Sequence, residues 1–341
     1  MLRQTAPAAT GANGPAGSGA ATGRGRLKPD ILLVVPLIDS AMAALDERFT
    51  VHRLWEAADP AAFAASVADR VRGLATTGAT GVKGDLIARL PRLEAVASYG
   101  VGVDAIDLAA CRARGIGVSN TPDVLTQEVA DFGMALLLAA ARRIPQADAY
   151  VRRGDYRRDG KDMYPLTTRA RGKRVGVVGM GAIGSAFAKL CGAFDMKVSW
   201  HGPRPKPGVP HPYVADLSTL AAEVDFLVLT CKGGPDTAGL VDAAVLRALG
   251  PKGTLVNIAR GSVVDERALV AALASGELGA AALDVHADEP NAAPELFAMD
   301  NVVIQPHVAS GTHETRGAMG QLVVDNLAAW FSERRLLTPV T

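Results

Sequence analysis

Apolar and polar positions along the chain alternate in a pattern that predicts strands separated by helices. From residue 31, short apolar runs are followed by segments with the length and composition of helices. The runs expected to form strands are Ile31–Val35, Val51–Trp55, Gly73–Thr76, Leu93–Ser98 and Gly117–Ser119. The segments expected to form helices are Ser40–Arg48, Pro60–Arg70, Lys83–Arg89 and Ala105–Arg114. Strands joined by such crossovers form a mostly parallel α/β sheet.

A long helix and a second alternation follow. The helix is expected to begin near Pro122-Asp123 and to run to about Arg143, and its apolar stretch predicts burial between two domains. Further strands are expected at 175–178, Met196–Trp200, Phe226–Thr230, Thr254–Ile258, Ala280–Val285 and Val302–Ile304. The last helix, Thr312–Phe331, is too far from another strand to extend this sheet, so it is expected to return to the first domain.

These elements predict an α/β fold of two lobes with a cleft between them. The first lobe, a flavodoxin-like substrate domain, is expected to combine residues 28–121 with residues 312–341. The second, a Rossmann-type dinucleotide-binding domain, is expected to span residues 122–311. Residues 1–27 contain no acidic residue and few large apolar ones, which predicts a disordered tail. A transit peptide is the alternative, although the tail has little amphipathic pattern.

A glycine-rich turn lies between a predicted strand and a predicted helix. The turn is Gly179-Met180-Gly181-Ala182-Ile183-Gly184, and the helix-forming run Ser185–Ala193 follows it. Strand, turn and helix in this order let the backbone approach a pyrophosphate, and the helix N-terminus offers free N–H groups to the anion. Glycines at this spacing also occur in ordinary tight turns, but this context favours a dinucleotide cofactor.

The segment after the next strand indicates which dinucleotide is bound. Where an Asp or Glu would accept hydrogen bonds from a free ribose 2′-hydroxyl, the chain has His201, Gly202, Arg204 and Lys206. Two cations suit a 2′-phosphate, so NADP is predicted and NAD is less favoured. The alternative is that both cations are solvated loop charges.

Three places beyond predicted strands of the second lobe carry candidate chemistry. Arg260 follows a strand, where its guanidinium can hold a carboxylate, although a lone arginine usually pairs with a nearby acid. His307 ends the last strand, and an imidazole suits proton transfer to a developing alkoxide. The segment Asp284–Pro290 offers carboxylates that could orient this imidazole, or it could be a solvated acidic loop. His286, within that segment, is a less favoured rival proton donor.

Composition excludes several classes of partner. The chain has 341 residues, of which 49% are hydrophobic, and 36 basic residues nearly balance 35 acidic ones, so neither nucleic acid nor a membrane surface is an expected partner. No apolar run reaches the roughly 18 residues of a spanning helix. Three cysteines form an odd, sparse set without metal-ligand spacing, which predicts no metal site and a cytoplasmic location.

In these motifs the chain resembles the D-isomer-specific 2-hydroxyacid dehydrogenases from about residue 30 to its end. The resemblance rests on Ser98–Asp104, Asn120–Thr126, the glycine turn, Asn257–Glu266, Asp284–Pro290 and Pro306–Gly311. Within the family it is most similar to the NADPH-dependent glyoxylate and hydroxypyruvate reductases, and Leu336–Val340 fits that branch. The resemblance implies reduction of a small 2-keto acid to the D-2-hydroxy acid, and it implies a homodimer formed through the long helix and the loop after it.

The resemblance also implies site residues. Arg260 matches the arginine that clamps the substrate, Glu289 the carboxylate that partners the histidine, and His307 the general acid. The backbone at Val101 and Gly102 matches the loop that receives the substrate carboxylate. Cofactor contacts are implied at Thr126, Gly179, Gly181, Ala182, Ile183, Gly184, His201, Gly202, Arg204, Lys206, Thr230, Cys231, Thr237, Ile258, Ala259, Arg260, Asp284, His307 and Gly311. One departure is Lys232, where the family often has proline.

Other functions remain open from the sequence. Bulkier keto acids such as hydroxyphenylpyruvate depend on the first-lobe wall near Thr77, Gly78 and Tyr99. An NAD-linked enzyme of the phosphoglycerate dehydrogenase type is disfavoured because no acid follows the second strand of the dinucleotide domain. A binding protein that senses the dinucleotide is the alternative outside enzymes, although Arg260, Glu289 and His307 together favour catalysis.

Overall fold

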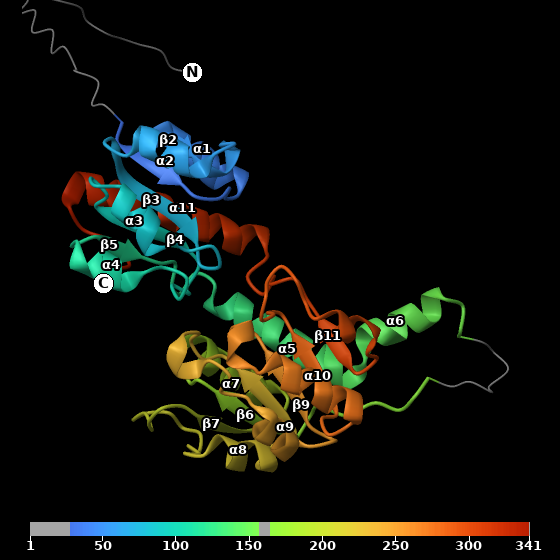
Figure 1. Cartoon of the computed structure of the whole chain (residues 1–341). Coiled ribbons are helices and arrows are strands. Elements are labelled where there is room, and N and C mark those ends of the chain that lie inside the picture. Colours follow the sequence, from blue (N-terminus) through green and yellow to red (C-terminus); the bar gives the residue numbers. More distant parts are fainter. Residues whose placement is uncertain (1–27, 157–163, 341) are drawn as a thin grey trace, which may run out of the picture.

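The computed structural model describes residues 28–156 and 164–340 and consists of two lobes, one above the other in Figure 1. The predicted tail, residues 1–27, lies outside the described residues. Each lobe is built around one parallel sheet covered by helices. In the described part of the chain, no helix has the length and apolar content that crossing a membrane requires.

The sheet of the first lobe has the strand order β2-β1-β3-β4-β5, and all its pairs are parallel. Its strands are β1 (Asp30–Leu33), β2 (Thr50–Arg53), β3 (Val71–Thr77), β4 (Ala95–Tyr99) and β5 (Gly117–Ser119). Its helices are α1 (Asp39–Arg48), α2 (Pro60–Val67), α3 (Gly84–Arg89) and α4 (Leu108–Ala113). The predicted flavodoxin-like fold is confirmed, since that fold has this order.

The sheet of the second lobe has the order β11-β10-β9-β8-β6-β7, again parallel throughout. Its strands are β6 (Arg174–Val178), β7 (Lys197–His201), β8 (Phe226–Leu229), β9 (Thr254–Asn257), β10 (Ala280–Leu283) and β11 (Val302–Ile304), and its helices are α7 (Ala182–Ala193), α8 (Leu217–Glu223), α9 (Ala243–Leu249) and α10 (Glu266–Ser275). A parallel bridge between Trp200 and Tyr213 adds the remnant of a further strand at the edge. With it, the remnant, β7, β6, β8, β9 and β10 have the order 3-2-1-4-5-6 of a Rossmann domain, as predicted, and β11 adds a further strand beside β10.

The long helix begins later than predicted and ends where it was predicted to end. α5 begins at Thr126 rather than near Pro122, because Asp123 has a φ of 65° and the chain turns there. It ends where Arg143 takes a left-handed conformation, and a separate helix that was not predicted, α6 (Ile144–Arg152), follows. One apolar core cluster runs from the first lobe through α5 into the second. The predicted burial between the lobes is therefore confirmed.

The last helix, α11 (His313–Glu333), returns to the first lobe and lies beside α1 and β4 (Figure 1). Glu94, at the start of β4, accepts hydrogen bonds from Arg72, Trp330 and Arg334, which ties the end of α11 to the sheet. Burial disfavours the charge on Glu94, but these three donors hold the pKa of its carboxyl at about 2.

Candidate active site

The glycine turn forms a cradle at the point where the strand order of the second sheet reverses. A Cβ on Gly179 would lie 2.6 Å from the Cα atom of Cys231, and one on Gly184 would lie 2.2 Å from the Gly179 carbonyl oxygen. Gly179 also has a φ of 97°, a conformation that favours glycine. Only Gly181 faces open space, and it precedes α7 without a side-chain cap. Open space beside uncapped N–H groups fits a pyrophosphate.

The loop after β7 brings the basic side chain of Lys206 to this cradle. β7 ends at His201, whose Nδ1 lies 3.1 Å from the Val214 carbonyl oxygen. The Lys206 ammonium donates a hydrogen bond of 2.8 Å to the carbonyl of Met180 within the glycine turn. Arg204 is exposed and forms no ion pair with any described residue. Lys206 beside the glycine turn fits the binding of a nicotinamide dinucleotide.

The segment after β8 packs against the glycine turn. The Thr230 hydroxyl donates to the Gly179 carbonyl at 2.7 Å, and Thr237 donates to the Lys232 carbonyl at 2.7 Å. Burial raises the pKa of the Cys231 thiol to about 11. The thiol therefore stays protonated near neutral pH and serves as packing for the turn.

A histidine and a carboxylate form a hydrogen-bonded pair at the end of β11. His307 Nδ1 lies 2.7 Å from Glu289 Oε2. A carboxylate can only accept, so Nδ1 carries the proton and Nε2 remains for another partner. Burial disfavours the charge on Glu289, but the hydrogen bond and the charge of His307, together with the hydrogen bond from the His286 N–H, hold the pKa of this carboxyl below its usual range. Both side chains are partly exposed, so the pair is open to a ligand.

The backbone around His307 is held by Asp284. Its carboxylate, which is buried, accepts hydrogen bonds from the N–H groups of Val308 at 2.8 Å and Ala309 at 2.9 Å. Its carbonyl accepts from the N–H of His307 at 2.7 Å, and His307 has a φ of 56°. Asp284 thus fixes the turn that presents the imidazole. Its predicted contact with the cofactor stays a prediction.

His286, the rival proton donor, is buried, with 8% of its surface exposed. Its Nε2 lies 3.0 Å from the Gln305 carbonyl oxygen, which can only accept, so this nitrogen carries the ring proton. Its Nδ1 has no hydrogen-bond partner among the described residues. The structure therefore favours His307 as the accessible imidazole.

Arg260 reaches from the second lobe to the first. Its Nε donates to Asp104 Oδ2 at 3.3 Å, and its Nη1 donates to the Ala259 carbonyl at 2.7 Å. A Cβ on Gly102 would lie 1.6 Å from Arg260 Nη2, so the guanidinium rests directly on the predicted carboxylate-binding loop. The carbonyl of Val101 in this loop accepts from the Asn120 side chain at 2.8 Å.

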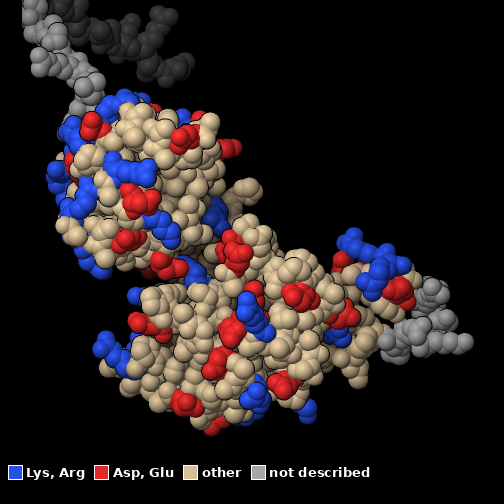
Figure 2. Space-filling view, in the orientation of Figure 1, with Lys and Arg blue, Asp and Glu red and all other residues tan. Residues whose placement is uncertain are grey.

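Sequence reasoning did not assign Asp104 a role, although this residue closes the Gly-Val-Gly-Val-Asp motif. The structure shows it as the acid that orients Arg260 across the lobes. In Figure 2 the surface narrows between the lobes, and both basic and acidic side chains lie there. The predicted clamp, carboxylate-binding loop and histidine pair therefore occupy the ends of strands from both sheets, where open α/β folds bind ligands.

Known proteins are similar in sequence to nearly the whole chain. The NAD binding domain of the D-isomer specific 2-hydroxyacid dehydrogenases matches residues 134–309. Hydroxyphenylpyruvate reductase from Plectranthus scutellarioides is 44% identical over 310 residues, which are 91% of this chain and 98% of that protein. 2-Ketogluconate reductase from Gluconobacter oxydans is 42% identical over 313 residues, covering 92% and 99% of the two chains.

A solved structure is also similar to this chain. The NADPH-dependent glyoxylate/hydroxypyruvate reductase from Sinorhizobium meliloti, in complex with NADP and malonate, superposes with a TM-score of 0.87 at 43% identity, over 92% of this chain and 97% of that one. The fold, the cradle for a dinucleotide and the sequence similarity agree. The chain therefore belongs to the D-isomer specific 2-hydroxyacid dehydrogenase family of oxidoreductases.

Proposed function

We propose that this protein reduces a small 2-keto acid, hydroxypyruvate or glyoxylate, to the D-2-hydroxy acid with NADPH. The observation that carries the proposal is the contact between the lobes. The second lobe holds both Arg260 and the His307–Glu289 pair, and the Arg260 guanidinium lies against the Gly102 loop of the first lobe. A cation beside a backbone loop suits a carboxylate, and a partnered imidazole suits proton transfer. Keto acid reductases among the relatives support this reaction class.

Each of the site residues has a distinct role in the proposed reaction. NADPH, held at the glycine turn, would supply the hydride that reduces the keto carbon. Arg260 and the backbone at Val101 and Gly102 bind the substrate carboxylate and orient the adjacent carbonyl. His307 gives its Nε2 proton to the oxygen of the reduced carbon, which completes the hydroxyl group. Glu289 keeps the proton of Nδ1 in place and stabilises the imidazolium form that precedes the transfer.

Variants of the proposed catalytic residues test these roles. His307→Ala and Arg260→Ala should each abolish turnover, because proton transfer and carboxylate binding are lost, while NADPH binding measured by fluorescence titration stays largely intact. Loss of NADPH binding in the arginine variant would count against its assignment to the substrate.

The choice of NADPH over NADH rests on Arg204 and Lys206 of the loop after β7, of which Lys206 contacts the glycine turn. The Sinorhizobium meliloti enzyme was crystallised with NADP, which supports this choice by similarity. Arg204→Ala should raise the KM for NADPH far more than the KM for NADH, because only NADPH carries the 2′-phosphate. Equal changes in both constants would contradict the assignment.

The substrate is tested by initial rates of NADPH and NADH oxidation with hydroxypyruvate, glyoxylate and phenylpyruvate. NADPH-selective reduction of hydroxypyruvate or glyoxylate is expected. Faster reduction of phenylpyruvate would assign a bulkier substrate such as hydroxyphenylpyruvate. A protein that binds NADPH and reduces none of the three would be a dinucleotide sensor or would act on another acid.

We also propose a homodimer in the cytoplasm. α6 extends away from both lobes in Figure 1, and large apolar side chains are exposed on it and near it: Ile144, Val151, Tyr156 and Leu166. Such a surface suits burial against a second copy. All three cysteines are free thiols, which supports a reducing compartment. Light scattering should give twice the mass of the chain, and a monomer would refute the dimer.

A further inference from the structure

Two consecutive residues between β5 and α5 hold the loop that is proposed to receive the substrate carboxylate. The Asn120 side chain donates a hydrogen bond of 2.8 Å to the Val101 carbonyl. Thr121 is fully buried and forms two hydrogen bonds with Gly100. Its N–H donates to the Gly100 carbonyl at 2.9 Å, and its hydroxyl accepts from the Gly100 N–H at 3.0 Å. The carbonyls of both loop residues are therefore fixed by the segment that joins the lobes.

The bond from Asn120 also determines where the next N–H group of the loop points. The Val101 carbonyl and the Gly102 N–H belong to one trans peptide unit, in which they point in opposite directions. Among the described residues, no acceptor lies within hydrogen-bond distance of the Gly102 N–H. Asn120 thus leaves this N–H free on the loop against which the Arg260 guanidinium lies. A free N–H and a guanidinium at one place suit a carboxylate.

Asn120 is itself held by the C-terminal segment, residues 336–340. The Thr338 hydroxyl donates to the Asn120 carbonyl at 2.6 Å, and the Asn120 N–H donates to the Thr338 carbonyl at 3.3 Å. An antiparallel bridge between Ser119 and Pro339 continues this pairing onto the end of β5. The segment is thus bound to Asn120 through its backbone and through one side chain.

A buried asparagine on α11 fixes this segment in turn. The side-chain oxygen of Asn326, which is fully buried, accepts from the N–H groups of Leu337 at 2.9 Å and Thr338 at 3.1 Å. Its amide nitrogen donates to the Thr338 hydroxyl at 3.0 Å and to the Leu322 carbonyl at 2.8 Å. Both donors and both acceptor positions of this amide are used. A continuous series of hydrogen bonds therefore runs from α11 through Thr338 and Asn120 to the substrate loop.

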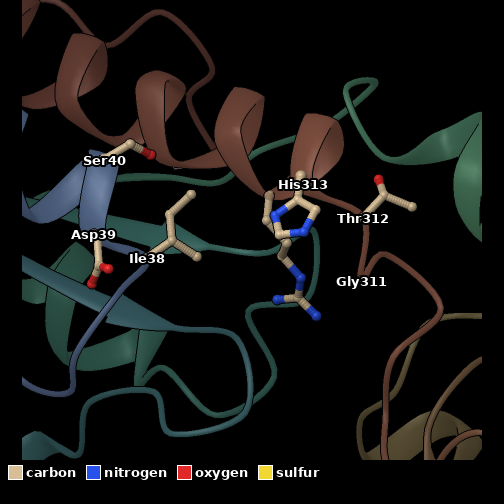
Figure 3. A pocket seen from close by; sticks show the side chains of 7 residues that line it. Ile38, Asp39, Ser40, Gly311, Thr312 and His313 are labelled. Carbon is tan, nitrogen blue, oxygen red and sulfur yellow. The ribbon is translucent and has the colours of Figure 1, made fainter.

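The start of α11 supports the same loop from its other end. It borders a cavity of about 700 Å³, beside which Figure 3 shows Thr312 and His313. Arg316 also lines this cavity, and its carbonyl accepts a hydrogen bond of 3.0 Å from the Tyr99 hydroxyl. Its guanidinium carbon lies 5.7 Å from the centre of the Tyr99 ring. Because Tyr99 directly precedes Gly100, α11 supports both the entry to the loop and, through Asn326, its anchor.

We propose that Asn120 and Thr338 are positioning residues for the substrate carboxylate. Asn120 orients the peptide unit between Val101 and Gly102, and Thr338 holds Asn120 in place. The inference rests on the proposed function, in which Arg260 and this loop bind the carboxylate. It gives the C-terminal segment a role in substrate affinity that acts through Asn120.

Substitutions that remove single hydrogen bonds test these roles. Thr338→Val removes the hydroxyl and keeps the branched shape of the side chain, whereas Thr338→Ser keeps the hydroxyl. Asn120→Leu keeps a similar shape and cannot donate to the Val101 carbonyl. Thr219→Val is the matched control, because the Thr219 hydroxyl also donates to a neighbour, the Asp216 carboxylate at 2.7 Å, but lies on α8 of the second lobe.

Three quantities are measured for each variant: kcat/KM for glyoxylate and hydroxypyruvate with NADPH, the Kd of oxamate in the presence of NADP by titration calorimetry, and the melting temperature. Oxamate has the carboxylate and the adjacent carbonyl of a 2-keto acid but is not reduced. Asn120→Leu should lower kcat/KM and oxamate affinity by about 10- to 100-fold, and Thr338→Val by about 3- to 10-fold. Thr338→Ser and Thr219→Val should keep both, and the Kd for NADPH should stay unchanged in all four variants.

A purely structural role of these residues gives a different result. Thr338→Val and Asn120→Leu would then melt at a lower temperature but keep the oxamate affinity and the kcat/KM of the wild type, which would overturn the proposal. If Asn120→Leu does not fold, the two Thr338 variants decide. Affinity that is lost in Thr338→Val and retained in Thr338→Ser supports the proposal, and equal affinity in both overturns it.

A failure of the proposed function is distinguishable from a failure of this inference. If no keto acid, glyoxylate included, is reduced, the reaction assignment is wrong, and the Kd of oxamate still tests the positioning. Weaker oxamate binding in Asn120→Leu and Thr338→Val would support it, and equal binding in all variants would refute it. A wild type that binds no oxamate would overturn the carboxylate site and, with it, the roles of Asn120 and Thr338.

Discussion

Replacing Gly102 by alanine probes the contact between the two lobes without removing any polar side chain. The added Cβ would lie 1.6 Å from Arg260 Nη2, whereas ordinary contacts begin at 3.4 Å. The atom that must move is the end of a flexible side chain, so the backbone can stay in place. The guanidinium, however, has to withdraw by about 2 Å from the loop on which it rests, a shift large on the scale that productive geometry tolerates.

The size of the effect follows from this displacement. A misplacement of about 1 Å can cost about 100-fold in rate, so Gly102→Ala should lower kcat/KM for the keto acid by at least about 100-fold, or about 2.7 kcal/mol. The free energy of unfolding should change by less than about 1 kcal/mol, because the partly exposed Arg260–Asp104 pair contributes little to it. The KM for NADPH should not change, since Gly102 lies on the other lobe.

The assay is the initial rate of NADPH oxidation, accompanied by thermal unfolding. Gly192→Ala is the control, because Gly192 lies on α7 and a Cβ there meets nothing within 4 Å. This variant should keep full activity and gain about 0.5–1 kcal/mol of stability. The reasoning about Arg260 would be refuted by a Gly102→Ala enzyme that keeps wild-type kcat/KM, or by one that loses NADPH binding instead.

Three further predictions concern the cofactor turn, the lobe contact and the end of α11. Gly181→Ala should keep the thermal stability but raise the KM for NADPH, whereas Gly184→Ala should lower the melting temperature, because its Cβ would lie 2.2 Å from the carbonyl oxygen of Gly179. Asp104→Asn should raise the KM for the keto acid and leave that for NADPH unchanged in steady-state kinetics. Glu94→Gln should lose about 1–2 kcal/mol in urea unfolding at pH 7. Since the folded-state pKa of Glu94 is lowered to about 2, its contribution is present above pH 4.5 and lost as the pH falls toward 2, where wild type and variant should become equal.

The strands and most helices could be predicted because their apolar runs are continuous and their boundaries carry turn residues. The boundaries that failed depend on single backbone conformations. α5 begins late because Asp123 has a positive φ, and the separate helix α6 was missed because Arg143, whose φ is also positive, divides it from α5. Neither residue is a glycine, so composition offered no signal. The start of α4 was placed at Ala105, whereas the Asp107 side chain caps the helix by accepting from the Ala110 N–H at 2.9 Å.

The candidate site was predictable where it follows strand ends and not where it depends on contacts across the lobes. His307, Glu289 and Arg260 each stand in a motif whose position on the sheet could be inferred. The pairing of Arg260 with Asp104 joins residues 156 positions apart, and no periodicity or spacing encodes it.

The guanidinium of Arg260 explains how one side chain could both hold the lobes and bind the substrate. Its Nη1 is used by its own lobe, at the Ala259 carbonyl, and its Nε by Asp104 of the other lobe. Nη2 faces the Gly102 loop. An ion pair of this exposure contributes at most about 1 kcal/mol, which is too little to lock two lobes together. If Arg260 binds the substrate carboxylate, as we propose, that contact would add to the free energy of closure, and binding of the correct substrate and alignment of His307 would occur in the same step.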